Sequence, residues 1–89
     1  MLFQLGQIVS TPGALKAMAD AGITPVQLLK RHINGDWGDL CAEDQESNQS
    51  ALHTEMRILS AYNVGGTVKV WIITEADRST TTFLLPEEY

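Results

Sequence analysis

The chain has 89 residues, enough for one domain over residues 1–89 and too few for a second hydrophobic core. Its composition, 44% hydrophobic and 19% charged, is typical of a globular protein and excludes the disordered and fibrous classes. The formal net charge of −5, from 11 Asp and Glu against 6 Lys and Arg, repels phosphate groups and disfavours nucleic acid as a partner.

Cysteine usage and hydropathy exclude further classes. The single cysteine, Cys41, cannot form an internal disulfide, and no Cys or His spacing indicates a metal or cofactor site. We interpret Cys41 as a small packed residue. The apolar stretches fall well short of the roughly 20 residues of a membrane span, and residues 1–8 show neither a basic leader nor a cleavage site. We therefore expect a cytoplasmic protein without a membrane partner.

The first elements in the chain are a short strand and a helix. Residues 2–9 alternate loosely in polarity, which indicates an edge strand weakened by Gly6. Thr11 is a suitable N-cap and Pro12 a suitable first helical residue, while Gly22 is a typical helix end. The apolar stripe of this helix consists of Ala14, Leu15, Ala17, Met18 and Ala21.

A second helix repeats the same pattern. Thr24 caps it, Pro25 opens it, and it ends near Gly35. We expect its buried face to consist of Val26, Leu28, Leu29 and Ile33. The two segments therefore predict a helical pair.

A third helix is expected over residues 42–55, after a turn-rich connector at 35–40. The segment contains no Pro or Gly and is polar apart from a thin apolar edge, so we expect it to be mostly exposed. Asp39, Glu43 and Asp44 place negative charge near its start, where the helix dipole favours it.

The last third of the chain has the two-residue period of β-strands. Strands are predicted over residues 57–64, 67–74 and 79–85, joined by a hairpin turn at Gly65-Gly66 and a second turn at 75–78. The fold class is therefore α+β: a short N-terminal strand, a helical pair, a third helix, and a three-stranded antiparallel β-meander.

The middle strand of this meander is apolar on both faces. Val68, Val70 and Ile72 point one way, while Trp71 and Ile73 point the other. Because the helical pair can cover only one face, the other requires cover from the third helix, the N-terminal strand or a second subunit. The pattern predicts a protein partner, and a homodimer is one form of it.

Two histidines and two arginines are the candidates for acid–base chemistry. His32 and His53 have unperturbed pKa values near neutral pH, and Arg57 and Arg78 lie on or beside the predicted sheet. Metal-independent RNA cleavage needs a base, an acid and a cation at the phosphorane, and these residues could supply all three. The alternative is that both histidines are caps or surface residues at helix ends.

Candidate binding residues lie in two turns. Trp37, in the connector, either plugs the core or stands exposed for binding. In the turn Asp77-Arg78-Ser79, Arg78 could bind an anion beside the hydroxyl of Ser79. The alternative there is a local ion pair that shapes the hairpin. The acidic residues between 36 and 46 either form a solvent-exposed helix start or face a basic protein partner.

Four segments together carry a resemblance to a known family: STPGAL at 10–15, GDWGDL at 35–40, ITEADRS at 73–79 and LLPEEY at 84–89. With them the chain resembles, over nearly its whole length, a family of small bacterial proteins common on plasmids and other mobile elements. Its members are usually described as hypothetical or plasmid-related, and some carry a type I restriction–modification label. That label indicates inheritance from neighbouring genes, because 89 residues cannot hold a methyltransferase or nuclease subunit. The resemblance implies no activity and no catalytic residue.

The order of elements is also similar to that of RelE-type and barnase-like ribonuclease toxins, although their usual basic charge differs from the acidic charge found here. Two main hypotheses follow. The first is an accessory protein of a mobile element that binds another protein. The second is a metal-independent ribonuclease that uses His32 or His53 with Arg57 or Arg78. An acidic nucleic-acid mimic is a third, but it requires a denser array of carboxylates.

Overall fold

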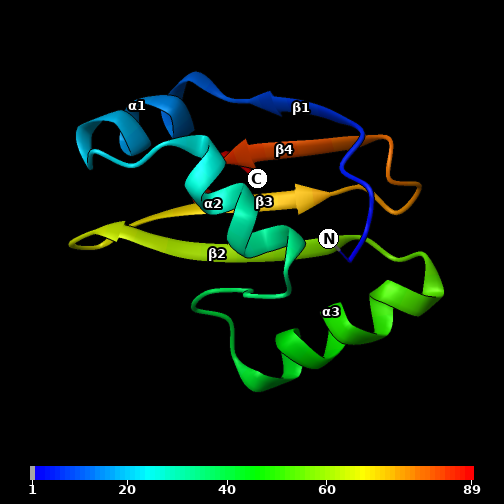
Figure 1. The fold of residues 1–89 in the computed structure, drawn as a ribbon. Coiled ribbons are helices and arrows are strands. Elements are labelled where there is room, and N and C mark those ends of the chain that lie inside the picture. Colours follow the sequence, from blue (N-terminus) through cyan, green and yellow to red (C-terminus); the bar gives the residue numbers. More distant parts are fainter. Residues whose placement is uncertain (1) are drawn as a thin grey trace.

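The computed structural model describes residues 2–89, which form an α+β fold of three helices and a four-stranded sheet (Figure 1). The elements in chain order are β1 (Gln7–Ser10), α1 (Pro12–Asp20), α2 (Pro25–Ile33), α3 (Ala42–Thr54), β2 (Ile58–Gly65), β3 (Val68–Thr74), β4 (Thr80–Leu84) and a 3₁₀ turn, η1 (Pro86–Glu88). The predicted class, helical pair, third helix and meander are confirmed. Within the described chain, no helix has the length and apolar character needed to cross a membrane.

The sheet is mixed, with the strand order β1-β4-β3-β2. Neighbours β2, β3 and β4 are antiparallel, in a register that sets Ile72 opposite Phe83. The N-terminal strand lies at an edge, as expected, but runs parallel to β4 and is shorter than residues 2–9. Gly6 limits its start: its φ is +64°, and a Cβ there would lie 2.2 Å from the carbonyl oxygen of Ser79.

Both proline-initiated helices begin where the sequence predicts. Thr11 Oγ1 accepts a hydrogen bond from the amide of Ala14 at 3.1 Å. Thr24 and Gln27 form a capping box, in which each side chain accepts a hydrogen bond from the other residue's amide. These starts depend only on residues within one helical turn, which is why the sequence predicts them well.

The buried stripes of the two helices differ from the predicted ones. Leu15 and Val26 point into solvent, with 49% and 57% of their surface exposed. His32 instead is fully buried on α2. The sheet beneath explains this, because Ser60 and Thr74 present hydroxyl groups to the imidazole.

One face of the sheet carries the hydrophobic core. In Figure 1, α1 and α2 lie over this face, whereas α3 runs beside the β2 edge. The larger cluster consists of Ala14, Met18, Leu28, Tyr62, Val64, Val70, Ile72 and Phe83. A second cluster consists of Phe3, Trp37, Ala51 and Ile58.

The opposite face of β3 receives cover from a residue that follows the meander. The ring of Trp71 meets that of Tyr89 edge to face, with 5.7 Å between centroids. Arg57 lies over the Tyr89 ring and contacts its hydroxyl. Ile73 is left only 6% exposed. Part of the cover for this face therefore comes from Tyr89, a source that the sequence pattern did not indicate.

The third helix is largely exposed and has Glu43 and Asp44 in its first turn, as predicted, but the residue before it, Cys41, differs from expectation. Its N-cap residue, Cys41, is exposed and makes no side-chain capping bond, so the expectation that Cys41 packs is wrong. Asp39 lies before the helix, and its carboxylate accepts a hydrogen bond from the amide of Asn63 at 3.1 Å. The Asp39 side chain is therefore bound to β2, outside α3.

Candidate functional site

His32 lies at the centre of a buried chain of hydrogen bonds. Its Nδ1 is 2.5 Å from Ser60 Oγ, and its Nε2 is 2.9 Å from Thr74 Oγ1. Thr74 Oγ1 is in turn 2.8 Å from Thr81 Oγ1, which donates to the carbonyl of Leu5 at 2.7 Å. This hydrogen-bond network links α2, three strands and the segment before β1.

The order of donors in this network shows that Nε2 of His32 carries a proton. Because Thr81 donates its one hydroxyl proton to Leu5, it must accept from Thr74. Thr74 then accepts from His32 Nε2–H, and in the neutral ring Nδ1 accepts from Ser60. Every member is satisfied with His32 neutral and protonated on Nε2.

Burial keeps His32 neutral and away from solvent. It lowers the pKa of the imidazole from 6.5 to about 4. Phe3 and Trp37 pack edge to face against the ring, at centroid distances of 5.1 and 6.0 Å. An imidazole enclosed in this way has no path to a substrate. It is neither the cap nor the surface residue that the sequence suggested.

The other basic candidates do not join His32. His53 is exposed on the last turn of α3, and Arg57 contacts Tyr89. Among residues 2–89, no hydrogen bond connects any two of His32, His53, Arg57 and Arg78. The same part of the chain contains no group of three or more His, Cys, Asp or Glu placed to hold a metal ion.

Arg78 links its turn to the end of α3. Its guanidinium donates to the carbonyls of Met56 and Ala51 at 2.7 and 2.8 Å, and to the carbonyls of Glu75 and Ala76 at 3.1 Å. Its backbone is left-handed, with φ of 61°. Its N–H groups are therefore directed at backbone oxygens, and this arrangement leaves them poorly placed to bind an anion.

The rest of this turn is also held internally. The Asp77 carboxylate accepts a hydrogen bond from the Ser79 amide at 2.9 Å, and hydrogen bonds from Ser79 lower the pKa of Asp77. Among residues 2–89 Arg78 makes no salt bridge, so the local ion pair given as one alternative is absent, and its guanidinium donates instead to backbone carbonyls of α3 and of the turn. Arg78, Asp77 and Ser79 together act as a brace.

Trp37 lies in the core, which was one of the two alternatives predicted for it. It is 3% exposed and stacks on Phe3 with 6.2 Å between ring centroids. Its carbonyl accepts a hydrogen bond from the amide of Ala61 at 3.1 Å, which holds the connector against β2. Trp37 is therefore an anchor between the connector and the core.

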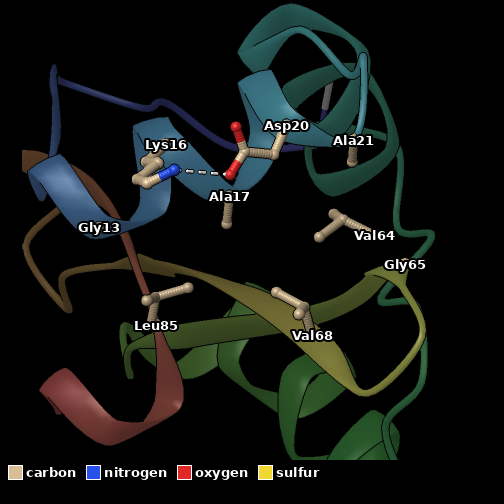
Figure 2. Close-up of a pocket in the computed structure, with 9 residues that line it drawn as sticks. All are labelled: Gly13, Lys16, Ala17, Asp20, Ala21, Val64, Gly65, Val68 and Leu85. Carbon is tan, nitrogen blue, oxygen red and sulfur yellow. Dashed lines mark hydrogen bonds and ion pairs between the residues drawn. The ribbon is translucent and has the colours of Figure 1, made fainter.

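An apolar groove lies between α1 and the β2–β3 hairpin (Figure 2). Its volume is about 470 Å³. In Figure 2, Ala17 points from α1 toward the hairpin, Val64 and Val68 point back toward the helix, and Leu85 closes one side. The lining residues are Gly13, Lys16, Ala17, Asp20, Ala21, Val64, Gly65, Val68 and Leu85.

Small side chains leave this groove hollow. Ala17 and Ala21 are one helical turn apart, so both short side chains lie on the same side of the helix. Gly65 adds no side chain on the hairpin, where a Cβ would meet no atom within 4 Å. As a result Val68 remains 45% exposed. An apolar group that filled the groove would remove this surface from water.

The rim of the groove carries one ion pair. Lys16 Nζ lies 2.9 Å from Asp20 Oδ2, and the hydrogen bond with Asp20 raises the pKa of Lys16. Both side chains are exposed, so the pair contributes little to stability. Because the two charges cancel, the lining as a whole is neutral.

These features define a small α+β protein with a hollow between one helix and one hairpin. Comparison of the chain with protein-family models, with curated proteins and with solved structures found no match. The chemistry of the groove is therefore the basis for a functional proposal.

Proposed function

We propose that the protein is a non-enzymatic accessory protein of a bacterial mobile element, in the cytoplasm, that acts by binding another protein through this groove. The mobile-element context comes from the resemblance of the four sequence segments. The observation that carries the binding proposal is a concave, apolar hollow of about 470 Å³ with Val68 exposed in it. Exposed apolar concavities of this kind are typical of binding sites.

The lining favours a protein side chain over a small molecule. Sites for small ligands combine an apolar wall with a few polar groups that fix the ligand's orientation. Here the charged groups of the lining are Lys16 and Asp20, which satisfy each other. An apolar side chain on a partner needs no such groups, because contacts outside the groove orient it.

The charge of the chain favours a basic partner. The net charge is −5, and the groove itself is neutral. A partner segment with Leu, Ile or Phe on one side and Lys or Arg around it would fill the groove and gain favourable electrostatics with the surrounding surface. We therefore infer an amphipathic, basic partner segment.

The ribonuclease alternative has less support. It needs an accessible base near a cation, whereas His32 is buried and Arg78 is bound to carbonyls. His53 and Arg57 are exposed, but no observation places them in a common cleft. Assay of RNA cleavage by the protein and by a His53→Ala variant tests this alternative, and we expect no cleavage by either.

An NMR titration tests the binding proposal. A model amphipathic helix of Leu and Lys is added to labelled protein, and a Leu and Glu helix serves as its charge-reversed counterpart. We expect the Leu–Lys helix to shift the amide signals of Ala17, Ala21, Val64 and Val68, with a dissociation constant on the order of 100 μM to 1 mM. The Leu–Glu helix should bind at least about tenfold more weakly.

Matched valine variants localise the binding. Val68→Ser removes an exposed apolar side chain from the groove, and Val26→Ser removes one of similar exposure from α2. Only the first should weaken binding of the Leu–Lys helix. Equal weakening by both variants, or shifts induced by toluene but not by the helix, would contradict a protein-binding groove.

A further inference from the structure

The edge of the sheet at β2 is closed by the rest of the chain. The Asn48 side chain donates to the carbonyl of Leu59 at 2.6 Å and accepts from its amide at 3.1 Å. Ala61 donates to the carbonyl of Trp37 at 3.1 Å and accepts from the amide of Asp39 at 2.7 Å. The outward backbone groups of these β2 residues are occupied, so a further strand cannot pair with them.

The opposite edge, at β1, is open. The amides of Gln7 and Thr11 donate to carbonyls of β4 and the turn before it. Because backbone groups alternate in direction along a strand, the N–H and C=O groups of Ile8 and Ser10 point away from β4. No strand within residues 2–89 pairs with this side of β1.

The side chains at this edge do not block pairing. Ile8 is 49% exposed and Val9 is 38% exposed. Protein edges that must stay unpaired usually carry a charge or a proline, and Gln7–Ser10 has neither. The whole segment 2–15 contains no charged residue, in a chain with a net charge of −5. Two acidic copies can therefore approach here with little repulsion.

We propose that β1 pairs antiparallel with β1 of a second copy, joining the two sheets across a twofold axis. In this register Val9 lies opposite Val9 of the second copy, and Ile8 lies opposite Ser10 of the second copy. Ile8 and Ser10, whose backbone groups point away from β4, are then opposite Ser10 and Ile8 of the second copy. These two residue pairs form about four backbone hydrogen bonds. The two Val9 side chains form the close cross-strand pair at the axis.

The interface is small, so the dimer is weak. A four-residue strand pair buries much less than the roughly 1,200 Å² of a stable interface. A dissociation constant on the order of 100 μM fits such a contact. This pairing uses the sheet edge and is independent of the groove between α1 and the hairpin.

Sedimentation over a concentration series, from about 10 μM to 1 mM, tests the proposal on the full chain. Wild type should shift from monomer to dimer across the series. Ile8→Pro removes an outward N–H without touching a bond to β4, and Val9→Lys places two like charges together at the axis. Each should raise the dissociation constant at least about tenfold. Val26→Lys, on α2, is the matched control and should leave it unchanged.

Hydrogen exchange provides a second, local readout. On raising the concentration, exchange should slow at the amides of Ile8 and Ser10, while Val9, already bonded to β4, should change little. A wild-type protein that stays monomeric throughout the series, or a folded Val9→Lys variant that dimerises as strongly as wild type, would overturn the proposal. Dimerisation should also survive Val68→Ser, so loss of groove binding and loss of pairing are separate results.

Discussion

The two ends of the covered sheet face are filled in opposite ways. At one end, His32, Ser60 and Thr74 fill the space between α2 and the sheet with a fully hydrogen-bonded polar chain. At the other end, Ala17 faces Val68 across a groove of about 470 Å³. The polar end is closed and the apolar end is hollow.

This difference shows that burial and polarity alone do not reveal function. The residues with the most recognisable chemistry are those the fold uses for its own stability. His32 makes both of its possible hydrogen bonds inside the core, and Arg78 makes several to backbone carbonyls. The surface left free for a partner is built from residues with no chemistry beyond their size and apolarity.

Removal of His32 is the strongest test of the closed end. We expect His32→Ala to lower the free energy of unfolding by about 3–5 kcal/mol, because it opens a cavity, leaves Ser60 without its buried acceptor and removes the donor to Thr74. The matched change His53→Ala, at an exposed position, should stay within about 0.5 kcal/mol. Urea denaturation at pH 7 measures both. Equal effects would remove the distinction between the two histidines.

Lowering the pH should lower the free energy of unfolding through His32. The pKa of His32 is about 4 in the folded chain against 6.5 for the free side chain, so the unfolded state binds more protons between these values. Stability should therefore fall as the pH drops from about 6.5 to about 4, by about 2–3 kcal/mol between pH 7 and 4.5. The measurement is the denaturation midpoint at each pH.

A His32→Gln variant is the control for this pH effect. It keeps a side chain that can hydrogen-bond but cannot titrate, so its stability should change less over the same window. An NMR titration in which the His32 ring protonates near pH 6.5 in the folded protein would contradict the expected direction.

A substitution of Asn48 tests how much the contact between α3 and the edge strand β2 contributes to stability. Its side chain makes two hydrogen bonds to the backbone of Leu59 from a 4% exposed position. Asn48→Ala should cost about 2 kcal/mol, because those backbone groups lose their partner. Gln49→Ala, on the exposed side of the same helix, should change stability by less than about 0.5 kcal/mol. Chemical denaturation of the two variants measures both changes in the free energy of unfolding.

Filling the hollow end should have the smallest effect and the opposite sign. Ala17→Leu places an apolar side chain in the groove and should raise the free energy of unfolding by up to about 1 kcal/mol. Ala14→Leu, on the same helix but at a fully buried position, should lower it by about 1–3 kcal/mol through overpacking. A destabilising Ala17→Leu would show that the groove is closed in solution.

The sequence predicts most of the secondary structure and little of the site. The starts at Thr11-Pro12 and Thr24-Pro25 were found because a cap acts within one turn. The exposure of Val26 and the burial of His32 were missed, since both depend on which face of α2 meets the sheet. The groove was also missed, because Ala17 and Ala21 resemble ordinary core residues until the hairpin opposite them is known.

The α+β class and the approximate bounds of the helices and of the meander strands follow from the sequence, because caps, turn residues and polarity periods act over a few neighbouring residues. Tertiary structure alone decided that β1 joins β4 in parallel and that Arg78 binds carbonyls of α3. It alone also decided that a hollow remains beside α1. Each of these depends on contacts between residues far apart in the chain, and no local pattern encodes the space between two elements.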